Sequence, residues 1–137
     1  MPIWLINADT IMKTILFIED ESALQKSFGE ILSQEGYEVI SALDGETGLR
    51  LANPPAGGKK PDLILLDLIL PKIHGFNVLK KLKAEPETKN IPVIVLTNLE
   101  GIKDVEETIE LGAKAYLVKD QYALEEVVEK IKKALTE

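Results

Sequence analysis

The stretch LILLD at residues 63–67 decides the fold, because four apolar residues run directly into a carboxylate. Three similar apolar runs also end before polar side chains: ILFI before Glu19, VIVL before Thr97 and AYLV before Lys119. If the four runs are parallel strands, their carboxyl ends share one edge of a sheet, where open α/β sheets bind ligands. The sequence therefore predicts that acids, a hydroxyl and an ammonium meet in one crevice, which suits a divalent metal and a phosphoryl group.

Five strand candidates alternate with five helix candidates along the chain, which is the pattern of βαβ units. We therefore predict an α/β fold with a doubly wound, five-stranded parallel sheet of the (βα)5 type. The strands are expected near residues 14–18, 37–42, 62–67, 92–97 and 115–118. The helices are expected over residues 22–35, 45–52, 76–84, 103–111 and 123–135.

Residues with turn and cap chemistry separate these elements. Asp44 is a fitting N-cap for the second helix, and Gly36 and Gly112 stand where the first and fourth helices should end. The stretch 53–60 is rich in proline and glycine and too short to link two domains. We expect it to be a loop on the rim away from the crevice.

Composition limits the possible classes of function. The 137 residues are 45% hydrophobic, which suits one globular domain. The net charge of −7 argues against a nucleic-acid partner, because phosphate contacts need clustered Lys and Arg. The chain has no cysteine, which excludes disulfides, a thiol nucleophile and a cysteine zinc site.

The first residues raise the question of a targeting segment. Asp9 and Lys13 interrupt the apolar stretch 1–18 and no basic segment precedes it, so a signal peptide is not predicted. No run approaches the roughly 20 apolar residues of a membrane span, and we expect a cytoplasmic protein with no membrane partner. Residues 1–12 are interpreted as an N-terminal extension or a start-site artefact, and residues 13–137 as the domain.

The acids at the predicted edge need a cation. Carboxylates gathered near strand ends repel one another by about 1 to 4 kcal/mol per close pair at surface-like dielectric. Oxygen ligands without histidine or cysteine favour a hard ion, so Mg²⁺ or Mn²⁺ is the expected cofactor. Asp67 is a strong candidate, because an exposed carboxylate after an apolar strand does no packing. His74 stands alone in a turn before Gly75 and is interpreted as structural or solvated.

With these residues in place, the chain resembles the receiver domain of two-component response regulators over about residues 13–137. The spacings of 30 residues from Asp67 to Thr97 and 22 residues from Thr97 to Lys119 are usual for that family. The resemblance implies a flavodoxin-like sheet with strand order 2-1-3-4-5. It rests on motifs that occur in the family's order: IEDE at 18–21, LLDLILP at 65–71 with Gly75, IPVIVLT at 91–97 and GAKAYLVK at 112–119.

The resemblance also implies a chemical role for the acids. Asp67 would be the phosphoacceptor, attacking a phosphohistidine of a histidine kinase or histidine phosphotransfer protein. Asp20, Asp67 and the backbone carbonyl of Ile69 would coordinate Mg²⁺, and Glu19 would hold a metal-bound water.

A switch at the phosphoryl group is implied as well. Lys119 would neutralise its charge, Thr97 would hydrogen-bond it, and Tyr116 would fill the space that Thr97 vacates. This change would reach a surface to which a downstream effector protein binds. That surface would consist of helix 103–111, strand 115–118 and helix 123–135.

Three positions depart from the family pattern. Asp120 stands where proline is common, which predicts a trans Lys119–Asp120 peptide bond and would allow Asp120 to pair with Lys119. Asn98 replaces a small residue and could limit the access of water or a partner. His74 replaces a short polar residue, and none of these changes removes an essential group.

Two classes with related architecture fit these residues poorly. A haloacid-dehalogenase-like phosphatase needs a second acid two residues after its nucleophile, where this chain has Ile69. A flavodoxin-like electron carrier needs a hydroxyl- and glycine-rich loop for the flavin phosphate, which Glu19, Asp20 and Glu21 would repel. The remaining alternative is a receiver-shaped interaction module that is never phosphorylated.

The expected protein is a signalling receiver rather than an enzyme with a separate substrate. No output segment is recognised beside residues 13–137, so we expect a stand-alone receiver whose signal passes to another protein. We further expect a monomer or a weak, phosphorylation-dependent dimer.

Overall fold

The computed structural model describes residues 12–99 and 101–136. Within them, every predicted strand and helix is present, with each end displaced by at most one residue. The strands are β1 (Thr14–Ile18), β2 (Glu38–Ala42), β3 (Leu63–Leu66), β4 (Val93–Thr97) and β5 (Ala115–Val118). The helices are α2 (Ser22–Gln34), α3 (Gly45–Ala52), α4 (Gly75–Ala84), α5 (Ile102–Glu110) and α6 (Leu124–Thr136), and a 3-10 turn, η1 (Lys119–Gln121), follows β5.

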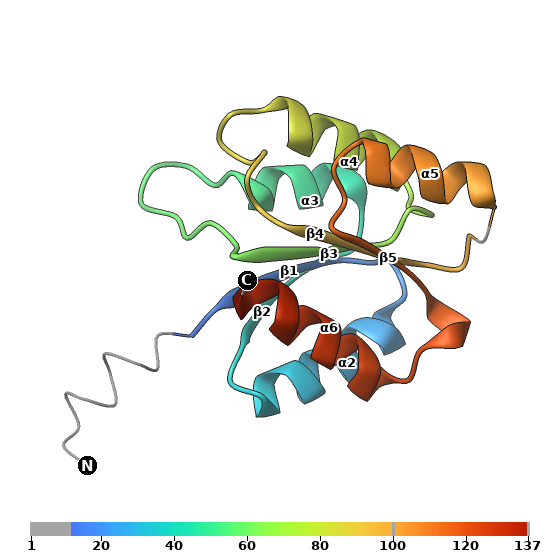
Figure 1. The fold of residues 1–137 in the computed structure, drawn as a ribbon. Coiled ribbons are helices and arrows are strands. Elements are labelled where there is room, and N and C mark those ends of the chain that lie inside the picture. The colour runs from blue at the N-terminus through green and yellow to red at the C-terminus, as the bar shows by residue number, and fades with distance from the viewer. Residues whose placement is uncertain (1–11, 100, 137) are drawn as a thin grey trace, which may run out of the picture.

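The strands form one parallel sheet in the order β2-β1-β3-β4-β5, which confirms the predicted fold class and strand order. Helices α3, α4 and α5 cover one face of this sheet, while α2 and α6 cover the other (Figure 1). All the strands run the same way, so the residues that follow β1, β3, β4 and β5 lie along one edge. The sheet therefore brings the predicted polar residues to a common place.

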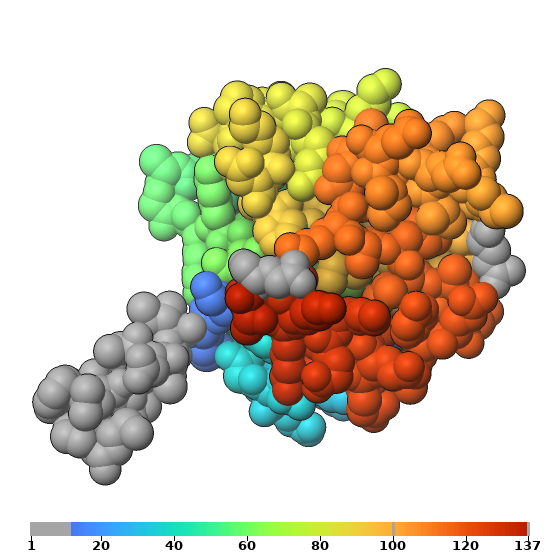
Figure 2. Space-filling view, in the orientation of Figure 1, coloured from blue at the N-terminus to red at the C-terminus, as the bar shows by residue number. Residues whose placement is uncertain are grey.

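The core consists of two apolar layers, one on each face of the sheet. Along β1 the side chains alternate, with Ile15 and Phe17 in the layer under α2 and α6, and Leu16 and Ile18 in the layer under α3 and α4. The rings of Phe17 and Phe28 meet edge to face with centroids 5.4 Å apart. In the space-filling view, α6 forms surface below the sheet and α5 forms surface above it (Figure 2).

The predicted caps and turns are confirmed. The Asp44 carboxylate accepts a hydrogen bond from the backbone N–H of Thr47 and so caps α3. Gly36 and Gly112 follow α2 and α5 with φ of +92° and +109°, the left-handed conformation in which glycine ends helices. The loop 53–60 enters β3 from the edge opposite to the crevice.

The predicted extension lies mainly outside the described residues, since description begins at Met12. Met12 is exposed, and its carbonyl accepts a hydrogen bond from Lys59 Nζ at 3.4 Å. Among the helices of the described residues, none has both the length and the apolar character that crossing a membrane requires.

Candidate functional site

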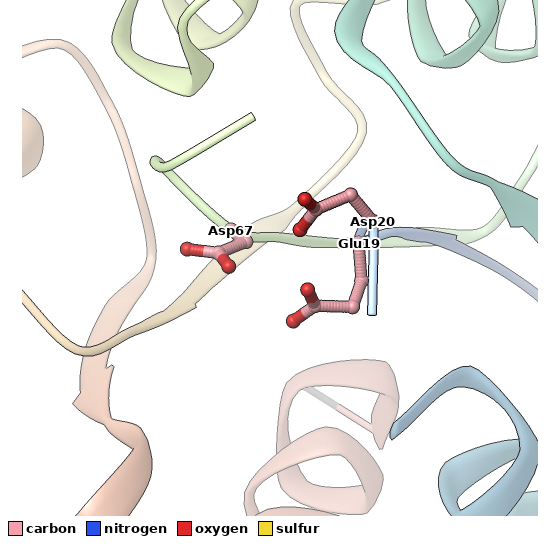
Figure 3. Close-up of side chains that lie close together, drawn as sticks. All are labelled: Glu19, Asp20 and Asp67. Atoms are coloured by element: carbon pink, nitrogen blue, oxygen red, sulfur yellow. The ribbon is translucent and has the colours of Figure 1, made fainter. Parts of the chain in front are cut away.

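Three carboxylates converge at the carboxyl ends of β1 and β3. Glu19 and Asp20 follow β1, Asp67 follows β3, and one ligand atom from each lies within 4.8 Å of the others. Figure 3 shows the carboxylates of Glu19 and Asp20 extending from the end of β1 toward Asp67. Glu19 and Asp67 are only 1% and 3% exposed, so the expectation of an exposed Asp67 carboxylate is wrong, while Asp20 is open to solvent. The convergence of these acids, predicted from their positions after the strands, is therefore observed.

Backbone hydrogen bonds fix the two strand ends relative to each other. The amide of Asp67 donates to the carbonyl of Ile18 at 3.0 Å, and the amide of Glu19 donates to the carbonyl of Ala42 at 2.9 Å. The parallel ladder thus continues to the first acid on β1 and to the acid on β3. As a result the two buried carboxylates leave the sheet at the same level.

The loop after Asp67 folds tightly against α4. Ile69 N–H donates to Asp67 Oδ1 at 3.1 Å, while the predicted role of the Ile69 carbonyl stays a prediction. Lys72 has a φ of +68° in a three-residue turn closed by a hydrogen bond from Ile73 N–H to the Pro71 carbonyl. Gly75 lies so close that a Cβ there would overlap the carbonyl of Asp67, so the loop requires glycine at this position.

Lys119 supplies the positive charge of the site. Its Nζ lies 2.8 Å from Asp67 Oδ2 and 2.6 Å from Glu19 Oε1, and its side chain is 15% exposed. The predicted convergence of Lys119 with the acids is therefore observed. Because one ammonium faces three carboxylates, the site keeps an excess of negative charge among the described residues.

Burial dominates the protonation of Glu19. Desolvation raises the pKa of Glu19 to about 6, although the hydrogen bonds from Lys119 and from the amide of Glu21 act to lower it. Burial alone would lower the pKa of Lys119, but its contacts with Asp67 and Glu19 outweigh burial and raise it. Lys119 therefore stays charged, and a second cation would favour the ionised form of Glu19.

The two predicted switch residues bond the same residue, Leu99, in the segment after β4. Thr97 is fully buried at the end of β4, and its Oγ1 accepts a long hydrogen bond of 3.5 Å from the amide of Leu99. The hydroxyl of Tyr116 on β5 donates to the carbonyl of Leu99 at 2.7 Å. Both side chains thus bind the residue that follows β4 by two positions, which the sequence did not reveal.

The three departures from the family pattern leave the site intact. No peptide bond is cis among residues 12–99 and 101–136, which agrees with the predicted trans bond after Lys119. The possible pairing of Asp120 with Lys119 is not observed among the described residues, because Asp120 is exposed while Lys119 turns inward to Glu19 and Asp67. His74 is exposed and caps α4 by accepting from Phe76 N–H, a structural role as interpreted, and Asn98 is exposed.

The donor set fits a hard divalent cation. All three acidic donors are carboxylate oxygens, and Mg²⁺ and Mn²⁺ prefer oxygen ligands in open, partly hydrated sites. Two of the carboxylates are buried together, where mutual repulsion is strongest and a cation has the largest effect. The described residues therefore suit Mg²⁺ or Mn²⁺.

A family model described as the response regulator receiver domain matches residues 15–132. Since this match spans most of the chain, the protein belongs to the response regulator receiver domain family of two-component signalling. Receiver domains are signalling modules, and this one carries an acidic pocket of the kind in which the family binds divalent metal.

Individual relatives agree with this assignment. The chain is 38% identical over 124 residues to the DNA-binding dual master transcriptional regulator RpaA of Synechocystis sp., covering 90% of this chain and 49% of that protein. The chain thus spans about half the length of this curated relative. It also resembles the crystal structure of the Mn²⁺-bound response regulator Rcp1, with 33% identity, a TM-score of 0.74 and coverage of 90% of this chain and 88% of that one.

A third relative supports the fold. The receiver domain protein described as CheY-like from Methanospirillum hungatei JF-1 is 29% identical, with a TM-score of 0.81. The alignment covers 91% of this chain and 94% of that chain. The architecture of the chain is therefore that of CheY-like receiver domains.

Proposed function

We propose that the protein accepts a phosphoryl group on Asp67 from a phosphohistidine of a histidine kinase or histidine phosphotransfer protein. The observation that carries this proposal is the position of Asp67, a buried carboxylate with Lys119 Nζ 2.8 Å from Oδ2 and Glu19 and Asp20 within metal-binding distance. A carboxylate in this position has no packing role that would account for its burial. This position supports the proposal that Asp67 is the reacting group.

In the proposed transfer, a carboxylate oxygen of Asp67 forms a bond to phosphorus. The phosphorus–nitrogen bond of the phosphohistidine breaks, and the imidazole leaves with the electron pair and takes up a proton from water. Lys119 would move from the carboxylate to the phosphoryl oxygens, whose negative charge it would neutralise. Apart from the bond that Asp67 forms, the protein mainly orients the reacting groups.

The acids would hold the divalent cation. Asp20, Asp67 and the carbonyl of Ile69 would bind Mg²⁺ or Mn²⁺ directly, and Glu19 would bind it through water. When bound, the ion would offset negative charge on the transferring phosphoryl oxygens. The pKa of Glu19, raised to about 6 by burial, would fall on metal binding because a nearby cation favours the carboxylate.

The phosphoryl group would be read by Thr97 and Tyr116. If the Thr97 hydroxyl turns toward the phosphoryl oxygens, it gives up its weak bond from Leu99 N–H and leaves a space that the Tyr116 ring can fill. The change would then pass to the surface formed by α5, β5 and α6. This is a population shift between two states, driven by contacts that exist only in the phosphorylated one.

The proposed partners are proteins. The net charge of −7 argues against a nucleic-acid partner for this chain, although the relative RpaA, of which the match covers 49%, is described as DNA-binding. A downstream effector would dock on the α5-β5-α6 surface. A cytoplasmic, monomeric or weakly dimeric protein is consistent with this role.

The test is phosphorylation by a small donor such as acetyl phosphate, with and without Mg²⁺, scored by intact mass for wild type and Asp67→Asn. We expect a Mg²⁺-dependent gain of one phosphoryl group that the variant lacks. Absence of an adduct, together with absence of a stable beryllofluoride complex, would instead favour the alternative, an interaction module that is never phosphorylated.

A further inference from the structure

Gln25 occupies an unusual position for a polar side chain near the start of α2. It is only 7% exposed and points at the ends of β1 and β2. Its Nε2 lies 2.8 Å from the carbonyl of Phe17, 3.0 Å from that of Glu19 and 3.2 Å from that of Ala42. Its Oε1 accepts a hydrogen bond of 2.8 Å from the hydroxyl of Ser41. The amide is thus fully bonded and has one orientation.

The carbonyl of Glu19 needs such a partner. The last ladder bond between β1 and β2 runs from Glu19 N–H to the carbonyl of Ala42, where β2 ends and the chain turns toward α3. Beyond that point no strand residue of β2 faces the Glu19 carbonyl, and the Gln25 amide takes this place. Gln25 therefore extends the sheet by one side-chain hydrogen bond where the backbone ladder stops.

This bond acts on both acids of β1 together. The carbonyl that Gln25 holds belongs to the peptide group linking Glu19 to Asp20, so its orientation determines where both side chains leave the backbone. The two carboxylates repel each other and Asp67, and a loop without a brace would relax by moving them apart. Gln25 lies on α2, which contributes no acid to the site, and its hydrogen bond opposes that movement.

We propose that Gln25 is a positioning residue that keeps Glu19 and Asp20 in register with Asp67 for the divalent cation and the phosphoryl group. This inference rests on the proposed function of Asp67. Ser41 would assist by fixing the amide orientation, because its hydroxyl donates to Oε1 and so leaves Nε2 to face the carbonyls. Hydrogen bonds thus connect Ser41 through Gln25 to the peptide group between Glu19 and Asp20.

The test compares Gln25→Met, which keeps length and removes the amide, with Ser41→Ala and with Gln34→Met as the matched control. Gln34 is an exposed glutamine at the end of the same helix. The first readout is the affinity for Mn²⁺, followed by electron paramagnetic resonance of the free ion. We expect Gln25→Met to bind Mn²⁺ about tenfold more weakly, as for other residues that orient metal ligands. Ser41→Ala should bind about fivefold more weakly, the equivalent of one hydrogen bond, and Gln34→Met should match wild type.

Urea unfolding by circular dichroism and labelling by acetyl phosphate complete the experiment. A purely structural glutamine would lower the urea midpoint and leave Mn²⁺ affinity and labelling rate of the folded protein unchanged, and that result would overturn the inference. If Gln25→Met does not fold, Ser41→Ala decides, since unchanged Mn²⁺ affinity in that variant contradicts the proposal. If wild type itself neither binds Mn²⁺ nor accepts a phosphoryl group, the proposed function fails. If wild type does both and the variants at Gln25 and Ser41 do so equally well, only the positioning role of Gln25 fails.

Discussion

The ammonium of Lys119 lies 2.8 Å from a carboxylate oxygen of Asp67, although 52 residues separate the two in sequence. The same ammonium also contacts Glu19, so one side chain from β5 bridges the acids that follow β1 and β3. In the absence of metal, this lysine is the cation that makes burial of the two carboxylates tolerable. The stability of the metal-free protein should therefore depend on Lys119.

Replacing Lys119 by Met should destabilise the metal-free protein. The change leaves Glu19 and Asp67 buried without a counter-charge, and removing one partner of a buried pair costs about 3 kcal/mol. Millimolar Mg²⁺ should recover more unfolding free energy in the variant than in wild type, because the ion replaces the lost charge. Urea unfolding with and without Mg²⁺ measures both effects.

Lys103→Met is the control for this experiment, since Lys103 is exposed and its ion pair within residues 12–99 and 101–136 is with Glu107 on its own helix at 3.9 Å. It should change stability little, as surface pairs contribute about 0 to 1 kcal/mol. A Lys119→Met protein as stable as wild type without Mg²⁺ would contradict the assigned role of Lys119.

Gly75→Ala should damage both the fold and the phosphoacceptor. A Cβ at this position would overlap backbone atoms of Asp67 and Leu68, which cannot move without moving Asp67 itself. We expect a loss of about 2 kcal/mol or more, in the range of overpacked cores, together with slower labelling by acetyl phosphate. Chemical unfolding and intact-mass kinetics measure the two effects.

Gly29→Ala provides the opposite expectation. Gly29 lies within α2, and a Cβ there meets nothing within 4 Å. Alanine should stabilise this helix by about 0.5 to 1 kcal/mol and leave labelling unchanged. If Gly75→Ala and Gly29→Ala had the same effect on stability and labelling, the close approach of Gly75 to Asp67 would not be the constraint on the site.

Tyr116→Phe should loosen the segment after β4. The variant loses the hydrogen bond from the Tyr116 hydroxyl to the Leu99 carbonyl, worth about 0.5 to 1.5 kcal/mol. Amide exchange at Leu99 should quicken because the Thr97 contact on the other side is long. Tyr122→Phe is the control, since the Tyr122 hydroxyl has no hydrogen bond within the described part of the chain, and it should leave exchange at Leu99 as in wild type. Equal exchange in the two variants would argue against Tyr116 as an anchor.

The cap at Asp44 predicts a pH dependence. Hydrogen bonds from Thr47, first of all from its backbone N–H, lower the pKa of the Asp44 carboxyl below its ordinary value of 3.8. A lowered pKa means that the stabilisation is complete above the ordinary value and disappears as the pH falls through the lower folded-state value. The stability advantage of wild type over Asp44→Asn should therefore shrink below about pH 4.

Urea midpoints of both proteins between neutral and strongly acidic pH measure this difference. Glu46→Gln removes an exposed acid from the first turn of the same helix and serves as the control. A constant difference between wild type and Asp44→Asn across the range would show that the charge of the cap has no part in the stability.

Much of the architecture could be predicted because it depends on local patterns. Apolar runs of strand length, helical spacing and glycine at helix ends located each of the five strands and five α-helices to within one residue, but not the 3-10 turn η1. The convergence of Glu19, Asp20 and Asp67 followed from the rule that parallel strands share an edge. These inferences need no knowledge of side-chain conformation.

The contacts made by side chains across elements could not be predicted in the same way. Gln25 gave only a weak signal, a polar residue spaced with the buried Phe28 and Leu32 on one side of α2. Its three carbonyl partners come from two strands, whose relative position is known only once the sheet is formed. The possible pairing of Asp120 with Lys119 is likewise not observed in the described residues, where Lys119 faces the acids and Asp120 in η1 is exposed.

The place of β5 at the sheet's edge has a consequence for biogenesis. In chain order, residues up to Asp67 already include the three adjacent strands β2, β1 and β3 and the acids Glu19 and Asp67 that follow β1 and β3. Lys119 joins them only when the final strand has docked. A chain that has emerged only as far as β4 therefore carries the acids of the site but not the ammonium that faces them in the finished fold.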